Sequence, residues 1–234
     1  MDNFAFIIGA VLPYVVIPIF LVGMIYRIHS WVKSPQPGKM TLFPAGGSPA
    51  REVLAETLFF PSLFKGDRVL WFFAWIFHVM LALVFLGHIR VFTAVIDSTL
   101  ASFGMSAEGI DTMSSVAGGV AGIIILATAL LLFFRRIAIP RVREITGLPD
   151  YLAPLLVIVI IATGDLLRFS GQHFDLEQTR IWALSLLTFS PVVPASGMFI
   201  IHLFLAQLLI VFIPFSKILH FGGIFFTQAL IKRS

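Results

Sequence analysis

Residues 77–88 read FHVMLALVFLGH, and residues 201–220 read IHLFLAQLLIVFIPFSKILH. Both stretches are apolar enough to lie inside a membrane, and each carries two histidines: His78 and His88 in the first, His202 and His220 in the second. A titratable side chain in hydrocarbon is costly, so an intramembrane histidine marks a functional site by default. The two stretches therefore predict two membrane-spanning helices that each carry a pair of functional imidazoles.

The composition of the chain predicts a membrane protein. Of its 234 residues, 59% are hydrophobic and only 12% are charged, and the mean hydropathy is +1.00. No soluble domain buries that much apolar surface, so lipid must solvate most of it. The chain has no cysteine, which excludes disulfides and iron–sulfur clusters held by its own thiolates.

Five apolar segments reach the length of about 20 residues that a membrane span needs. They lie at approximately 4–26, 69–96, 114–134, 150–169 and 196–219. The first lacks the basic n-region and small-residue cleavage site of a signal peptide, so we expect a retained helix. Between the first two, REVLAETLFFPSLF at 51–64 has an amphipathic pattern that suits the membrane surface. The expected fold is an all-α membrane protein, one integral-membrane domain of five transmembrane helices over residues 1–234.

The basic residues predict the orientation in the membrane. Thirteen of the sixteen fall on one side of the predicted helices: Arg27, Lys33, Lys39, Arg51, Lys65, Arg68, Arg135, Arg136, Arg141, Arg143, Lys217, Lys232 and Arg233. The other side has Arg90, Arg168 and Arg180, together with Asp97, Glu108, Asp111, Asp175 and Glu177. Basic loops stay in the cytoplasm, so we expect the N-terminus outside and the C-terminus cytoplasmic, in the inner membrane of a prokaryote. This asymmetry explains the pI near 9.8 without nucleic acid.

Depth along the two helices predicts which histidines face each other. His78 and His88 are ten residues apart, or about 15 Å along a helix, and His202 and His220 are eighteen apart, or about 27 Å. Because the two spans run in opposite directions, His88 pairs with His202 at an outer level and His78 with His220 at an inner one. The unequal separations require a tilt, or a bend before His220, which Pro214 favours.

Two imidazoles at each level are the axial ligands that a six-coordinate haem needs. Other interpretations remain: the histidines hydrogen-bond to carbonyls, or they form a proton relay of a transporter. Copper or zinc is disfavoured because methionine is the only other soft ligand at these depths, and Met80 and Met198 suit packing better than iron ligation.

The chain resembles the di-haem gamma subunit of respiratory nitrate reductase and the related DsrM-type cytochrome b of sulfur metabolism. The spacing of the four histidines carries the resemblance. So do LPYVVIPIFLVGMIYR (12–27), AGGVAGIIILATALLLFFRRIAIPRVREITG (117–147), FSGQHFD (169–175) and PFSKILH (214–220). It covers nearly the whole chain.

The resemblance implies two haem b groups with His78, His88, His202 and His220 as axial ligands. It further implies menaquinol oxidation near the outer haem, and electron transfer inward to a cytoplasmic iron–sulfur partner of the heterodisulfide-reductase type. Additional membrane and extracytoplasmic subunits are expected. The stretches SLFKGDR (62–68) and IYRIHSWVK (25–33) favour the DsrM-like branch. A b subunit of a nitrate reductase or of a membrane heterodisulfide reductase is the alternative. Nitrate reductase members have a lysine before the third helix, where this chain reads EGIDTMSS (108–115).

The quinone site and the haem propionates have further candidate residues at the ends of the helices. For the quinone these are Gly87, Arg90, Glu108, Asp111, Gln172 and His173, and for the propionates Arg90, Arg135 and Arg136. Gly87 would let a ring approach the backbone. Solvation, lipid headgroups and membrane topology explain the same charges without a ligand. His29 is expected in a cytoplasmic loop, and Gly118, Gly119 and Gly122 suit close helix packing.

Three classes of protein are thus distinguished. The favoured one is a quinol-oxidising electron-transfer subunit of an oxidoreductase complex. A transporter would show broken helices, repeats or several intramembrane carboxylates. Here the carboxylates collect at the ends of the spans, and Asp165, near an outer end, is the closest exception. A structural anchor would have no use for buried histidine pairs.

Overall fold

The computed structural model describes residues 3–33, 49–169, 175–220 and 222–223. All regular elements among these residues are helices. Five of them are long and apolar enough to cross a membrane: Asn3–Lys33, Arg68–Phe92, Ala107–Ala138, Leu148–Phe169 and Gly197–Phe215. The predicted all-α fold with five spanning helices is therefore confirmed.

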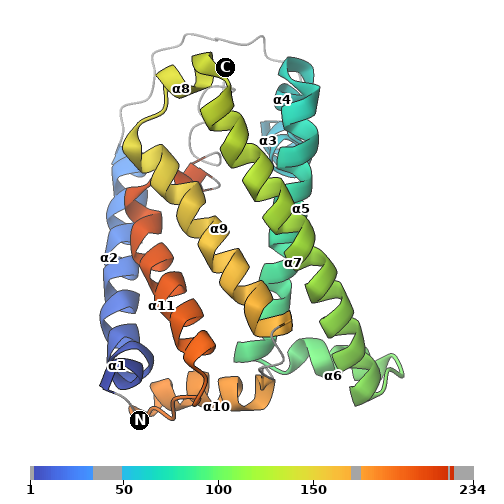
Figure 1. The fold of residues 1–234 in the computed structure, drawn as a ribbon, viewed down its shortest axis with the longest axis vertical. Coiled ribbons are helices and arrows are strands. Elements are labelled where there is room, and N and C mark those ends of the chain that lie inside the picture. Colours follow the sequence, from blue (N-terminus) through green and yellow to red (C-terminus); the bar gives the residue numbers. More distant parts are fainter. Residues whose placement is uncertain (1–2, 34–48, 170–174, 221, 224–234) are drawn as a thin grey trace.

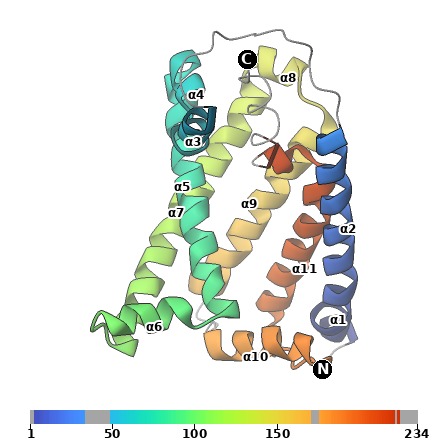
Figure 2. The same cartoon turned by 180° about the vertical axis from the view of Figure 1, so that it is seen from behind.

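The spanning helices pack in an order that differs from their order in the chain. Helix α2 (Leu12–Lys33) packs on α11 (Gly197–Phe212), α11 on α9 (Leu148–Phe169), α9 on α7 (Ala107–Ala138), and α7 on α5 (Arg68–Phe92). In both views of the ribbon α9 lies between α5 and α11 (Figures 1 and 2). Helices α5 and α11, which carry predicted ligands, are thus linked through α7 and α9.

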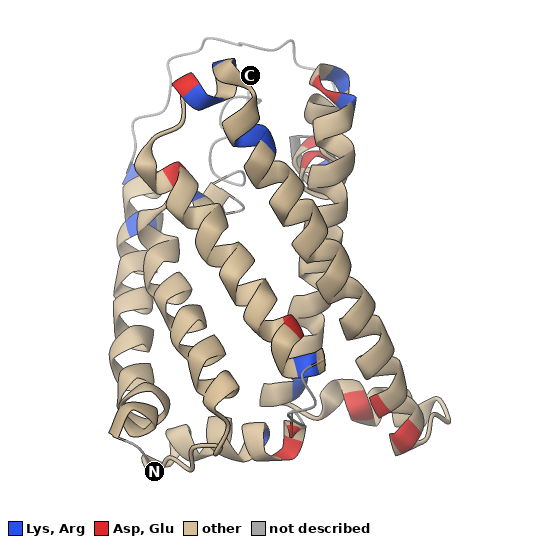
Figure 3. Ribbon diagram, viewed as in Figure 1, with Lys and Arg blue, Asp and Glu red and all other residues tan. Residues whose placement is uncertain are grey.

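Short helices lie at both ends of the bundle. Helices α3 (Pro49–Phe59), α4 (Pro61–Gly66) and α8 (Pro140–Glu144) share one end, and α6 (Val95–Ser102) and α10 (Leu176–Leu187) share the other (Figure 1). Most of the Lys and Arg residues lie at the first end, here called the basic end, whereas Asp and Glu outnumber Lys and Arg at the second, the acidic end (Figure 3). Helices α6 and α10 are not among the elements predicted from the sequence.

An apolar cluster near the acidic end joins α10 to the bundle. Its buried members come from five different elements: Ile8, Val91, Leu167, Trp182, Ala183, Phe199 and Ile200. Met198 packs against this cluster, as expected for a packing residue. The cluster fixes the acidic ends of α5, α9 and α11 relative to one another.

The helix bounds differ from the predicted ones where caps and proline act. The first span continues to Lys33, so His29 lies on α2 and its predicted place in a loop is wrong. The second ends at Phe92 rather than at 96, and the third begins at Ala107, where the Ser106 hydroxyl caps it by accepting from Gly109 N at 3.1 Å. The fifth ends at Phe212 and continues as two 3₁₀ turns, Ile213–Phe215 and Lys217–Leu219, because Pro214 cannot extend the α-helix.

A π-helical turn, η1 (Ile7–Val11), interrupts the first span after α1 (Asn3–Phe6). Such a turn leaves backbone carbonyls free to accept other donors. Gln207 Nε2 donates to Ile8 O at 3.0 Å, and Trp182 Nε1 donates to Gly9 O at 2.8 Å. The N-terminal helix is thereby joined to α11 and α10 inside the bundle.

Candidate functional site

The four intramembrane histidines form two facing pairs. The ring centroids of His88 and His202 are 6.4 Å apart with the planes inclined by 22°, and those of His78 and His220 are 5.9 Å apart with the planes perpendicular at 90°. These are the same pairs that the depth argument matches. The two pairs lie about ten residues, or about 15 Å, apart along α5.

The bend after α11 explains how His220 reaches the inner level. The α-helix stops at Phe212, and His220 follows directly after the 3₁₀ turn Lys217–Leu219. Pro214 and Leu219 are fully buried and fix this turn against the bundle. The residues before His220 therefore do not continue α11 as a straight helix. For straight helices, His78 and His88 would be about 15 Å apart and His202 and His220 about 27 Å apart, and the bend removes this conflict.

Three of the rings have their Nδ1 atom bound to a backbone carbonyl. The distances are 2.7 Å from His78 to Ala74 O, 2.8 Å from His88 to Val84 O, and 3.1 Å from His220 to Lys217 O. A carbonyl only accepts, so Nδ1 must carry the proton in each case, and the lone pair is left on Nε2. This second hydrogen bond is the arrangement that orients a metal-ligating histidine.

His202 obtains the same arrangement from a side chain. Its Nδ1 lies 3.0 Å from Thr163 Oγ1, and that hydroxyl donates to Ile160 O at 2.9 Å, so it is free to accept from the ring. The next residue, Gly164, lets α9 approach closely: a Cβ there would lie 3.3 Å from His202 Cε1. Thr163 is not among the residues that the sequence singles out, although a hydroxyl inside an apolar span is a signal for such a role.

The four histidines are the residues that could hold haem, two at each level, because their ring centroids approach to 6.4 Å and 5.9 Å. The described residues contain no group of three or more His, Cys, Asp or Glu able to hold a metal ion. Pairs of histidines suit a cofactor that brings its remaining ligands, as porphyrin does.

An ion-pair cluster occupies the acidic ends of the helices next to His88. Arg90 Nε lies 2.6 Å from Asp97 Oδ1 and its Nη2 lies 3.0 Å from Asp111 Oδ1, while Arg180 Nη2 lies 2.5 Å from Asp97 Oδ2. Arg180 Nε also donates to Arg90 O at 2.6 Å. We call these four residues the acidic-end cluster. Burial opposes ionisation of Asp97, but hydrogen bonds from Arg180 and Arg90 outweigh it and hold the pKa of that carboxyl below its usual value.

The acidic-end cluster changes the interpretation of two candidate quinone residues. Arg90 is only 8% exposed, and its guanidinium is engaged by two carboxylates, one of which belongs to Asp111. Both residues thus have partners inside the protein, and the cluster ties α5 to α6, α7 and α10.

The other candidates at the ends of the helices are distributed differently. Glu108 is exposed in the first turn of α7, and open space lies where Gly87 would carry a Cβ. Gln172 and His173 lie outside the described residues. Among the described candidates, the structure therefore joins Arg90 to Asp111 by a hydrogen bond, and Glu108 and Gly87 lie outside that contact.

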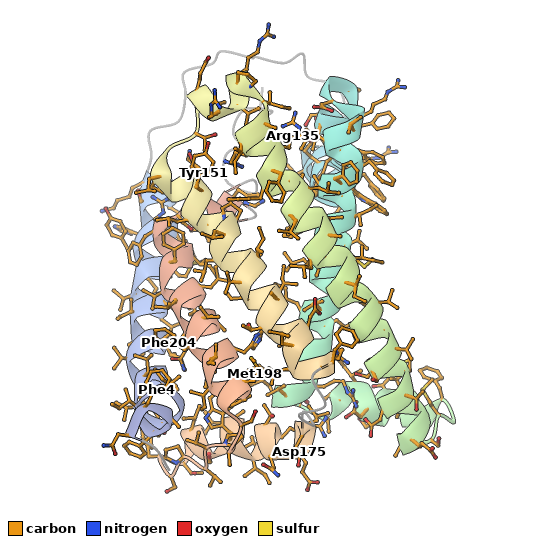
Figure 4. The ribbon with its side chains drawn as sticks, in the orientation of Figure 1. Phe4, Arg135, Tyr151, Asp175, Met198 and Phe204 are labelled. Atoms are coloured by element: carbon orange, nitrogen blue, oxygen red, sulfur yellow. The ribbon has the colours of Figure 1, made fainter. Side chains whose placement is uncertain are left out.

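The propionate candidates Arg135 and Arg136 lie in the last turn of α7, and Figure 4 places Arg135 near the basic end. Arg135 Nη2 contacts Asp67 Oδ2 at 2.7 Å. Asp67 also caps α5 by accepting from Leu70 N at 2.9 Å. This backbone hydrogen bond lowers the pKa of the Asp67 carboxyl; burial opposes it, and the contact with Arg135 lowers the pKa further. Arg135 therefore joins the basic ends of α5 and α7.

Five apolar helices with paired histidines at two depths define the class: a multi-pass membrane protein. The sequence profile of the nitrate reductase gamma subunit family matches residues 61–231. The chain belongs to that family, whose members are membrane subunits of oxidoreductase complexes.

The chain is similar to two groups of proteins. The chain is 31% identical to the Hdr-like menaquinol oxidoreductase cytochrome b-like subunit of Archaeoglobus fulgidus, over 94% of this chain and 78% of that protein. The corresponding subunit of Archaeoglobus profundus is 29% identical over 92% and 76%. The respiratory nitrate reductase 1 gamma chain of Escherichia coli is 30% identical over 64% of this chain and 69% of that protein. The expected resemblance to the nitrate reductase gamma subunit family is confirmed.

Proposed function

We propose that this chain is a di-haem b-type subunit that oxidises menaquinol near its acidic end and passes the electrons across the membrane to a partner at its basic end. The observation that carries this proposal is the pair of facing imidazoles at each of two levels. A single level would serve only half of the membrane. Two levels about 15 Å apart divide a core of about 30 Å into steps.

The histidines would hold two haem b groups, His88 with His202 at the outer level and His78 with His220 at the inner one. Iron with two imidazole ligands has no open position and exchanges single electrons rather than binding oxygen. The chain's own contribution is to fix the rings. Each Nδ1 has a hydrogen-bond partner, which selects the tautomer that presents Nε2.

The charge distribution supports a cytoplasmic basic end, with the N-terminus outside and the C-terminus inside. The membrane would be the inner membrane of a prokaryote. Oxidation of quinol at the acidic end then releases protons outside while electrons move inward, which conserves energy.

The partners follow from the more similar relatives. The names of the two archaeal proteins contain both menaquinol and Hdr-like, and they match nearly the whole chain. These names favour menaquinol as the electron donor and a cytoplasmic iron–sulfur partner of the heterodisulfide-reductase type. Together with the resemblance to the DsrM-type cytochrome, they support a role in sulfur-compound respiration within a larger membrane complex. A nitrate reductase subunit is the alternative. It is less favoured because the nitrate reductase 1 gamma chain matches a shorter part of this chain.

The test is the haem content of the protein purified from haem-replete cells. We expect b-type reduced-minus-oxidised bands and about two haems per chain. His88→Ala and His202→Ala should lose the same haem, and His78→Ala and His220→Ala the other, whereas the control His29→Ala keeps both. A folded, colourless protein would refute the proposal, and losses shared across the two pairs would refute the assignment of levels.

A further inference from the structure

We propose that Asp165 is the residue that accepts the protons released when quinol is oxidised; this inference rests on the proposed function. Asp165 lies on α9, four residues before that helix ends at Phe169. Four residues correspond to about 6 Å of helix, which places the carboxyl just inside the membrane at the acidic end. A carboxylate at such a depth is costly and is a functional-site candidate in itself.

The carboxyl of Asp165 is directed at α7 and lacks a partner there. Its Oδ2 atom is buried and has no hydrogen-bond partner among the residues that the structure describes. Opposite it, α7 presents Gly122, and a Cβ at that position would overlap with Asp165 Oδ1. The chain has therefore kept a polar atom without a partner where a smaller apolar residue would pack, which favours a chemical role over a structural one.

Asp165 is also close to the outer histidine pair. The two preceding residues both approach His202: Thr163 through a hydrogen bond of 3.0 Å, and Gly164 through the close approach that its missing Cβ allows. One short stretch of α9 thus touches the ring that would bind the outer haem and carries the free carboxylate. Oxidation of a quinol needs this combination, an electron acceptor and a proton acceptor within reach of one ring.

The charges of the acidic-end cluster are already engaged with one another. In the acidic-end cluster, Arg90 and Arg180 bind Asp97, and Arg90 also binds Asp111. The charged group that faces Asp165 is Arg168, on the same helix and one turn nearer the end.

Arg168 is exposed and lies over Gly118 of α7, where a Cβ would come within 2.6 Å of Nη2. Its Nη1 donates to Ser115 O at 3.2 Å and, more weakly, to Ser114 O at 3.4 Å. Asp165 and Arg168 therefore form a polar path along the glycine face of α7, from the level of His202 to the exposed end of α9.

The reaction balances with this single carboxylate. Oxidation of one quinol breaks two O–H bonds and yields one quinone, two protons and two electrons. The two electrons would leave one at a time, because a haem held by His88 and His202 under the proposed function would supply a one-electron acceptor. Each proton passes to the Asp165 carboxylate, which releases it past Arg168 to the water at the acidic end before it accepts the next.

The test compares Asp165→Asn with Asp165→Glu in the full protein in lipid vesicles. Asp175→Asn is the matched control, because it neutralises an exposed acid at the same end, and asparagine also serves as an N-cap for α10. The readouts are haem content, the rate of haem reduction by a menaquinol analogue as a function of pH, and the infrared carboxyl band that titrates in the purified protein.

We expect Asp165→Asn to keep both haems but to be reduced by the quinol roughly 100-fold more slowly, with a flattened pH profile. It should lack a titrating carboxyl band that the wild-type protein and the Asp175→Asn control show. Asp165→Glu should recover much of the rate. A wild-type rate and pH profile in Asp165→Asn, or loss of haem in both variants, would overturn the inference. If the quinol fails to reduce the haems of the wild-type protein while dithionite reduces them, the proposed function falls together with the inference.

Discussion

Thr163 provides the sharpest single-residue test of how the outer pair is held. Thr163→Val keeps the shape of the side chain but removes the hydroxyl that accepts from His202 Nδ1 at 3.0 Å. Because Thr163 is buried, with 9% of its surface exposed, the ring N–H would be left without its partner at a cost of about 1–3 kcal/mol. Loss of such a second hydrogen bond from a metal-ligating histidine typically weakens metal binding by about 10- to 100-fold.

The assay for Thr163→Val is a redox titration combined with the haem content per chain. We expect the outer haem to bind more weakly and its potential to rise, since a less electron-rich imidazole stabilises ferric iron less. The inner haem should be unaffected. Thr128→Val is the matched control, because Thr128 is buried on α7 and its hydroxyl bonds only within its own helix, to Ile124 O at 2.8 Å and Ile125 O at 3.1 Å. Equal effects of the two variants, or a change in the inner haem, would refute the reasoning.

Three further substitutions test other parts of the structure. Asp97→Asn should lower the free energy of unfolding by about 1–3 kcal/mol at neutral pH. Because the pKa of Asp97 in the folded protein lies below its ordinary value, the variant and the wild type should differ fully in thermal melts above about pH 4. This difference should disappear as the pH falls through the lowered pKa. Phe60→Gly relieves a left-handed backbone (φ 50°), so the fold should tolerate it, but it removes the ring whose centroid lies 5.1 Å from that of His78. We expect redox titration to show a shifted potential for the inner haem only. An unchanged potential of the inner haem would show that this ring has no influence on it. Gly9→Ala would bring a Cβ within 2.5 Å of Val193 Cγ1 and should lower the yield of folded protein, with wild-type melting as the contrary result.

The sequence was sufficient for those features that depend on distance along a helix. Five apolar segments of spanning length gave the number of membrane helices, and the rise per residue with alternating direction matched His88 with His202 and His78 with His220 in depth. Pro214 indicated the bend before His220, since a proline inside a helix removes a backbone hydrogen bond and clashes with the preceding turn. Pro18 and Pro154, by contrast, stand inside α2 and α9 without ending them. Iron ligation at these rings remains a proposal.

The features that the sequence did not reveal depend on lateral arrangement. Arg90 and Asp111 were reasonable candidates for a quinone as isolated charges, but their mutual contact requires knowledge that α5, α6 and α7 end side by side. Thr163 acquires its role only because α9 packs on α11. The π-helical turn at Ile7–Val11 likewise depends on donors from α10 and α11, which no pattern inside the first span predicts.

The most direct test of the account is an experimental density map of the protein purified from haem-replete cells. For a di-haem subunit, we expect two flat macrocycles inside the bundle, one between His88 and His202 and the other between His78 and His220. Nε2 of each ring should be bonded to iron. Density that connects these rings to another ligand, or that leaves the space between them filled by protein alone, would contradict it.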